Sequence, residues 1–179
     1  MKRSPRAITA TYLQSAAASY LERYPSSAEK LRRILQRRVA KARLLEAPVM
    51  DDAEQAIEAI IAKFVGAGVV DDKSFAETKV RALHRRGTSG RLMRHKLKAA
   101  GIDDETLDRA LTGLDQELDG DAAAREWQAA MALARRRRLG PFRKAEERTE
   151  HRMRDLAAMA RAGFDYALAK KVIDSKEIA

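Results

Sequence analysis

Apolar residues recur every three or four positions along most of this chain, which is the spacing of one face of an α-helix. Short polar residues that can accept hydrogen bonds from the free N–H groups of a first helical turn precede these stretches. Reciprocal capping boxes are predicted at Thr11 with Gln14, at Ser26 with Glu29 and at Asp51 with Glu54. The three helices that follow are expected to bury Leu13, Ala17, Tyr20, Leu21 and Tyr24, then Leu31, Ile34, Leu35 and Val39, then Ile57, Ile60, Ile61 and Phe64.

The same order of helices recurs further along the chain. Further helices are expected to begin at Asp72, after the turn Gly87-Thr88-Ser89-Gly90, and at Asp103, Asp121 and Asp165, with one more that buries Met153, Leu156 and Met159. A shift of 62 positions places Ser27, Leu31 and Leu35 on Ser89, Met93 and Leu97, and it places Gly101 and Ile102 on Gly163 and Phe164. A shift of 50 places Ile57, Ile60, Ile61 and Phe64 on Leu107, Ala110, Leu111 and Leu114, and a long connector at about residues 41–50 explains the difference.

This internal similarity predicts an all-α protein, an elongated tandem array of three three-helix repeats with about nine helices. The predicted division is a basic tail at residues 1–6 followed by units at residues 7–69, 70–116 and 117–179. Chance similarity among amphipathic helices is the alternative explanation of the pattern.

The net charge indicates an acidic or polyanionic partner. The chain has 36 Lys and Arg residues and 26 Asp and Glu residues, which gives a net charge of +10. The net charge is +8 in residues 1–46, +3 in 47–100, −7 in 101–121 and +6 in 122–179, which favours an elongated molecule. The chain has no cysteine, so disulfides and Cys-based zinc sites are excluded. It has no apolar run of membrane-spanning length and no signal-peptide pattern, so the cytoplasm is the expected location.

The order and spacing of several short segments resemble the RecX family, bacterial regulators of the RecA recombinase. The segments are Tyr20-Leu21 with Arg23, Ser27 and Leu31; the junction from Phe64 through Gly66, Gly68, Asp71 and Asp72 to Phe75-Ala76; the run from Leu97 to Gly101-Ile102; and the run from Met159 to Gly163-Phe164. Family members usually carry a Gly just after the second helix of the first unit, where this chain has Val39-Ala40 and a longer connector.

The resemblance implies an elongated, modular monomer that lies in the helical groove of the RecA–DNA filament. It implies that the protein blocks filament growth or promotes disassembly, and lowers ATP hydrolysis and strand exchange, with weak binding to single- or double-stranded DNA. It implies no enzymatic chemistry, no cofactor and no metal. A stand-alone helical DNA-binding protein is the alternative, since three-helix units with a net charge of +10 suit that role too.

The candidate residues for contact with RecA or DNA are basic and lie in three places. They are Arg32, Arg33, Arg37 and Arg38; Arg85, Arg86, Arg91, Arg94 and Lys98; and the consecutive run Arg135, Arg136, Arg137 and Arg138. Arg32, Arg33 and Arg37 lie away from Leu31 and Leu35 and can form one solvent-facing patch, whereas the consecutive run must wrap around its helix. The alternative for each group is a charged face that only keeps its helix in water.

Other polar features have structural explanations. The turn between Arg86 and Arg91 matches the Gly-x-x-Gly loop of KH domains, but that module needs strands, so a helix–helix turn capped by Ser89 is the better interpretation. The pairs Asp71-Asp72 and Asp103-Asp104 are interpreted as helix caps. His84, His95 and His151 lack metal-ligand spacing, and Trp127 and Tyr20 are interpreted as core residues.

Overall fold

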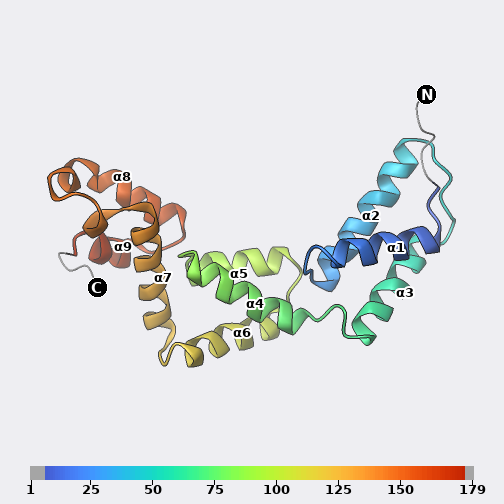
Figure 1. The fold of residues 1–179 in the computed structure, drawn as a ribbon, viewed down its shortest axis with the longest axis horizontal. Coiled ribbons are helices and arrows are strands. Elements are labelled where there is room, and N and C mark those ends of the chain that lie inside the picture. The colour runs from blue at the N-terminus through green and yellow to red at the C-terminus, as the bar shows by residue number, and fades with distance from the viewer. Residues whose placement is uncertain (1–6, 176–179) are drawn as a thin grey trace. The chain divides into compact units, whose positions relative to one another are not determined.

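The computed structural model describes residues 7–175, which form nine α-helices and two short 3₁₀ helices without a β-strand (Figure 1). The α-helices are α1 (Ala10–Leu21), α2 (Ala28–Leu44), α3 (Ala53–Gly66), α4 (Asp72–Arg85), α5 (Gly90–Ala99), α6 (Asp104–Glu117), α7 (Ala122–Arg137), α8 (Arg148–Arg161) and α9 (Tyr166–Ile173). The 3₁₀ helices η1 (Gly140–Phe142) and η2 (Ala145–Glu147) lie between α7 and α8. The predicted all-α class with three-helix repeats is confirmed.

Two compact bodies contain these helices. The first body comprises the described residues through Phe75 together with Ala100–Ile102, and the second comprises Ala76–Ala99 and the residues from Asp103 onward. Helix α4 therefore begins in the first body and continues in the second. The unit boundaries predicted at residues 69/70 and 116/117 stay a prediction, and the predicted basic tail at residues 1–6 lies outside the described residues.

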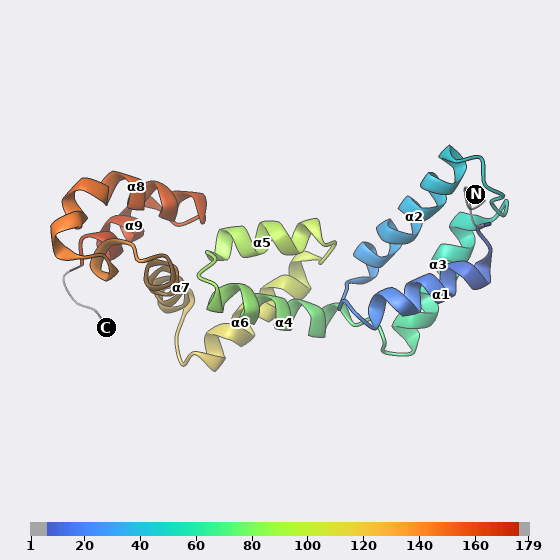
Figure 2. The same cartoon turned by 45° about the horizontal axis from the view of Figure 1, so that its top comes forward.

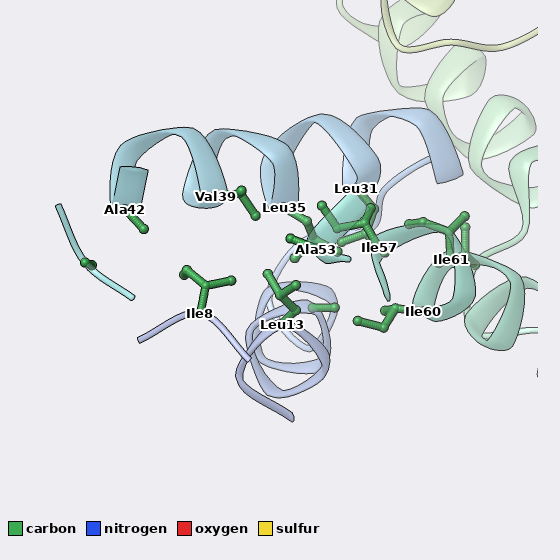
Figure 3. Packing of buried hydrophobic residues seen from close by; sticks show 13 residues of the cluster. Ile8, Leu13, Leu31, Leu35, Val39, Ala42, Ala53, Ile57, Ile60 and Ile61 are labelled. Atoms are coloured by element: carbon green, nitrogen blue, oxygen red, sulfur yellow. The ribbon is translucent and has the colours of Figure 1, made fainter. Parts of the chain in front are cut away.

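The core of the first body forms where α1, α2 and α3 pack together (Figure 3). Helix α2 contributes Leu31, Leu35, Val39 and Ala42, spaced three or four residues apart, so all four point to one side of the helix. Leu13 of α1 and Ile57 of α3 are fully buried against them. This shared burial is what stabilises the three helices, because a single amphipathic helix of this length is marginal in water.

The helix starts of the first body differ from the predicted capping boxes. Thr9, not Thr11, caps α1 by accepting a hydrogen bond from the Tyr12 N–H at 3.2 Å. The cause lies in Ile8, whose N–H donates to the Pro48 carbonyl and whose carbonyl accepts from the Met50 N–H, which holds the chain extended up to Thr9. This contact is an isolated parallel β-bridge between Ile8 and Val49.

The other two predicted caps are each shifted by one residue. Ser27, not Ser26, caps α2, where its Oγ accepts from the Lys30 N–H at 3.2 Å. Asp52, not Asp51, is the N-cap of α3, and its side chain makes no capping bond. Ser27 is fixed by a distant contact, because its Oγ also donates to the Ala100 carbonyl at 2.5 Å.

Two predicted core residues are exposed. Tyr24 is 55% exposed because α1 ends at Leu21, so Tyr24 lies in the following turn, 5.3 Å from the Tyr20 ring. Met153 is 71% exposed because α8 buries the side formed by Asp155, Leu156, Ala158 and Met159, and Met153 lies on the other side of the helix. Tyr20, Leu21, Ile34 and Phe64, predicted as buried, are half-buried.

Helix α2 runs to Leu44, so the connector that follows it is shorter than the predicted connector at about residues 41–50.

In the second body, α4 to α6 and α7 to α9 form two further sets of three helices (Figure 2). The first set buries Val80, Met93, Leu97 and Leu107, and the second set buries Leu156, Met159, Val172 and the small residues Ala129, Ala130 and Ala134. Caps at Asp103, Asp121 and Asp165 match the sequence prediction, since each carboxylate accepts a backbone N–H three residues later.

Equivalent junctions recur at the starts of α2 and α5. The Ala28 N–H of α2 donates to the Asp72 carboxylate at the start of α4, at 2.8 Å. The Gly90 N–H of α5 donates to the Glu126 carboxylate near the start of α7, at 2.9 Å. In each case a carboxylate from the first helix of one set neutralises the positive end of the second helix of the set before it. The repeat seen in the sequence thus extends to these two capping hydrogen bonds.

Candidate binding surfaces

The arginines of α2 are engaged with acidic side chains of the same body to different degrees. The Arg32 Nε donates to Glu58 of α3 at 2.7 Å, and Arg32 also pairs with Glu29, so its side chain is only 28% exposed. These hydrogen bonds hold the pKa values of the Glu58 and Glu29 carboxyls below their usual range. Arg33 pairs with Glu29 at 2.6 Å. The basic patch predicted on α2 is therefore largely neutralised at its N-terminal end.

Arg37 and Arg38 lie further along α2 and are exposed. The Arg37 Nε donates to the Arg33 carbonyl at 3.2 Å, and an Arg38 terminal nitrogen donates to the Tyr12 hydroxyl at 3.2 Å. Arg38 borders a hollow of about 460 Å³ along α1, lined by Tyr12, Ser15, Ala16, Ser19, Tyr20, Arg23 and Tyr24. Tyr20, interpreted as a core residue, is thus also part of a surface hollow.

The basic residues of α5 also include both paired and unpaired side chains. Arg94 pairs with Asp108 at 2.5 Å and Lys98 pairs with Asp104 at 2.7 Å, both across to α6. Arg91 is exposed and has no side-chain partner among the described residues. Only Arg91 of these three therefore presents its charge uncompensated to a partner.

A hollow of about 600 Å³ joins the end of α4 to one face of α7, and we call it the tryptophan hollow. It is lined by Arg85, Trp127, Gln128, Met131, Ala132, Arg135 and Arg136. Trp127, interpreted from the sequence as a core residue, is only half-buried, and the Lys171 ammonium of α9 lies 4.9 Å from its ring centroid. Arg86 is exposed beside Arg85. The sequence did contain a signal for this surface. A spacing of four residues places Trp127, Met131 and Arg135 on one face of α7.

The run Arg135–Arg138 is divided among several environments, as expected for consecutive residues of a helix. All four side chains are exposed. The Arg135 guanidinium lies 5.4 Å from the Phe142 ring centroid, while Arg136 faces the tryptophan hollow. Arg137 borders a different hollow, and Arg138 ends α7 with a left-handed backbone at φ +54°.

The hollow beside Arg137 contains arginines that the sequence analysis missed, and we call it the arginine hollow. It has a volume of about 360 Å³ and is lined by Arg137, Leu139, Arg143, Arg154, Asp155, Ala158 and Arg161. Asp155 is 1% exposed, and Arg143 donates to its two carboxylate oxygens at 2.9 and 3.2 Å. Arg154 and Arg161 are isolated in the sequence, and only their spacing of seven on α8 indicated a shared face.

The turn before α5 and the aspartates at the start of α4 have structural roles. Ser89 caps α5 by accepting from the Leu92 N–H at 3.3 Å, so the turn at Gly87 to Gly90 joins two helices. Asp71 accepts from the N–H groups of Lys73 and Ser74, while the neighbouring Asp72 caps α2 instead. His84 is buried with its Nε2 3.1 Å from the Arg125 carbonyl. Within residues 7–175 no group of three or more His, Cys, Asp or Glu could hold a metal ion, and no helix there is long and apolar enough to cross a membrane.

Sequence comparison relates this chain to a family of regulatory proteins. A family model described as the second three-helix domain of RecX matches residues 71–111. The chain is 40% identical over 172 residues to the regulatory protein RecX of Myxococcus xanthus, which covers 96% of this chain and 89% of that protein. It is 33% identical over 108 residues to regulatory protein RecX of Agrobacterium fabrum, which covers 60% of this chain and 53% of that protein. For regulatory protein RecX of Thermobifida fusca the identity is 34% over 122 residues, 67% of this chain and 60% of that protein.

Two solved structures share the fold. One is a crystal structure of regulatory protein RecX, with a TM-score of 0.56 and 22% identity over 93% of this chain and 72% of that chain. The other is RecX from Lactobacillus salivarius, with a TM-score of 0.59 and 21% identity over 93% of this chain and 96% of that chain. At these identities the likeness concerns the arrangement of helices.

Proposed function

The chain belongs to the RecX family of regulatory proteins, and we propose that it regulates the RecA recombinase by binding the RecA–DNA filament in its groove. In this proposal it acts in the cytoplasm as a monomer, and it lowers ATP hydrolysis, filament growth and strand exchange. The observation that carries the proposal is the 40% identity to a regulatory protein RecX over 96% of this chain.

The uncompensated arginines support a polyanionic partner. Arg85, Arg86, Arg91, Arg136 and Arg138 are exposed, and no acidic side chain among the described residues pairs with them. An arginine that already pairs with a carboxylate must give up that contact to bind another anion, whereas these residues keep their full electrostatic attraction. DNA phosphates and acidic side chains on RecA are both suitable counter-charges.

The proposed mechanism is binding without chemistry. Each three-helix set offers some exposed arginines, so several modest contacts can form at once on a filament made of repeating subunits. Once one contact has formed, the next takes place at a high effective concentration, and the combined affinity exceeds that of any single contact. A protein held in this way would oppose the addition of subunits and the movements that accompany ATP hydrolysis.

A hydrolysis assay tests the proposal. RecA is assembled on single-stranded DNA with ATP, and this protein is added in increasing amounts. We expect hydrolysis to slow at amounts below one molecule per RecA subunit. Hydrolysis that is unchanged at equimolar protein would refute the proposal.

A stand-alone DNA-binding function is the second candidate, and the tryptophan hollow favours it. Proteins that bind single-stranded nucleic acids use aromatic rings for base stacking and arginines for phosphate contacts, and the half-buried Trp127 lines this hollow together with arginines. A salt titration separates the two functions. Affinity for naked DNA that falls steeply with salt and does not change when RecA is present would favour the second candidate over the first.

A further inference from the structure

The arginine hollow in the second body gathers four guanidinium groups around a single buried carboxylate. Arg137 comes from the end of α7, Arg143 from the segment after η1, and Arg154 and Arg161 from α8. Leu139 and Ala158 complete the lining together with Asp155. Residues from three segments thus direct positive charge toward one volume of about 360 Å³.

The negative charge of Asp155 is already committed inside the protein. One of its carboxylate oxygens accepts from the Gly140 N–H at 2.9 Å and from the Arg143 Nε at 3.2 Å, and the other accepts from an Arg143 terminal nitrogen at 2.9 Å. Arg143 also lies 3.7 Å from Glu147. Asp155 therefore compensates Arg143 and ties η1 to α8, and its described hydrogen bonds come from Gly140 and Arg143 rather than from the other arginines of the hollow.

The other three arginines are uncompensated. Arg137, Arg154 and Arg161 are exposed, and their side chains have no hydrogen-bond or ion-pair partner among residues 7–175. Like charges held around one hollow repel each other, and the repulsion grows where protein atoms replace part of the surrounding water. An anion in the hollow would convert that repulsion into attraction to all three groups.

The geometry of α8 favours an extended anion. Arg154, Ala158 and Arg161 follow at intervals of four and three residues, so they lie on one face of the helix. The small Ala158 leaves space between the two long side chains. With a rise of about 1.5 Å per residue, the Cα atoms of Arg154 and Arg161 are about 10 Å apart, further than a single phosphate group extends. Guanidinium groups match phosphate oxygens in two-bond contacts, so linked phosphates fit this spacing.

We propose that the arginine hollow is a binding site for a chain of linked phosphates, held by Arg137, Arg154 and Arg161. Two sources share this chemistry, the backbone of a nucleic acid and a free polyphosphate such as a nucleoside triphosphate. The site goes beyond the proposed action on RecA and does not depend on it, because the three arginines, their charge and their shared hollow are properties of this chain alone.

Binding measurements on the full chain without RecA test the site. The probes are a fluorescein-labelled thymidine oligonucleotide, followed by anisotropy, and inorganic triphosphate, followed by titration calorimetry. The test variant is Arg154→Gln with Arg161→Gln. The matched control is Lys41→Gln with Lys63→Gln, which removes the same amount of positive charge from exposed positions of α2 and α3. Circular dichroism checks the helix content of both variants, and Arg137→Gln provides a second test variant.

We expect the test variant to bind at least one probe about tenfold more weakly or worse, while the control changes little. Loss confined to the oligonucleotide identifies a nucleic-acid backbone as the ligand, with the slope of log affinity against log salt reduced by about 1.4 for two lost phosphate contacts. Loss that includes triphosphate identifies a free polyphosphate. The affinity of Arg154→Lys with Arg161→Lys for the probes is expected to lie between those of the wild type and the Gln variant, since lysine keeps the charge without the two-bond geometry.

Three outcomes would overturn the site. They are equal losses of affinity in the test and control variants, binding of neither probe, and equally tight binding of an oligoglutamate peptide.

Discussion

Gly163 lies so close to Ser89 that a Cβ atom built on Gly163 would stand 2.3 Å from the Ser89 Oγ. Gly163 also has φ +92°, a backbone conformation that other residues adopt only at a cost. The equivalent glycine 62 positions earlier also lies against the first turn of a helix, because a Cβ on Gly101, at φ +83°, would stand 2.2 Å from the Glu29 Cβ of α2. Each glycine turn therefore closes directly over the first turn of the second helix in the preceding set.

This contact predicts a large effect of Gly163→Ala. The left-handed backbone and the collision with Ser89 together are expected to lower the free energy of unfolding by about 2 to 4 kcal/mol. Thermal or urea unfolding followed by circular dichroism measures the change. Gly113→Ala is the control, because Gly113 lies within α6 with no atom near its would-be Cβ, and it is expected to raise stability by about 0.5 to 1 kcal/mol. Equal effects of the two substitutions would contradict the packing described.

Ser26 and Ser27 are adjacent serines whose replacement by alanine is predicted to affect stability to very different degrees. Ser27→Ala removes both the cap of α2 and the hydrogen bond to the Ala100 carbonyl, so we expect a loss of about 1 to 3 kcal/mol in unfolding free energy. The Ser26 Oγ is buried and has no partner among the described residues, so Ser26→Ala should change stability by less than about 0.5 kcal/mol. Urea unfolding of the two variants side by side checks this order, and a larger loss for Ser26→Ala would reverse the assignment of the cap.

The contact of Arg32 with Glu29 and Glu58 makes stability depend on pH. Hydrogen bonds from Arg32 lower the pKa of both carboxyls in the folded protein from the ordinary value of 4.5. Their stabilisation is therefore complete above pH 4.5 and is lost as the pH falls through the lowered folded-state values. We expect Arg32→Gln to lower the thermal midpoint near neutral pH and to have progressively less effect on acidification. A difference between wild type and variant that stays constant across the acidic range would refute this coupling.

The division between paired and unpaired basic residues predicts which of them matter for regulation. Arg85→Gln with Arg136→Gln removes two arginines that border the tryptophan hollow without acidic partners, and we expect a several-fold higher protein concentration for half-inhibition of RecA-catalysed ATP hydrolysis. Arg94→Gln with Lys98→Gln is the control, because these side chains already pair with Asp108 and Asp104. A stronger defect in the control would show that the paired residues contact the filament.

The candidate surfaces were predicted from the sequence only in part. Arg85, Arg91 and Arg136 follow from the positions of basic residues on the predicted helices, and the structure leaves them exposed. Trp127 was interpreted as core, since a large aromatic residue at apolar spacing is normally buried, and its partial exposure depends on where α4 and α9 lie against α7. For Arg154 and Arg161 the only signal is their spacing of seven residues, and it is a weak one because single arginines on a charged helix are common.

The sequence by itself determined the helical class, the order of helices and the repeat that relates Ser27 to Ser89 and Gly101 to Gly163, because these depend on periodicity and on local backbone preferences. Only the tertiary structure decided that Ser27 rather than Ser26 caps α2, since the Ala100 carbonyl that fixes Ser27 lies 73 residues away in the sequence. It also decided that Arg32 forms an ion pair with Glu58, while Arg154 has no acidic partner among the described residues. The interaction between two charges weakens as the distance between them grows. The local periodicity of a sequence does not specify how far apart residues of different helices lie, so it cannot predict which charges form pairs.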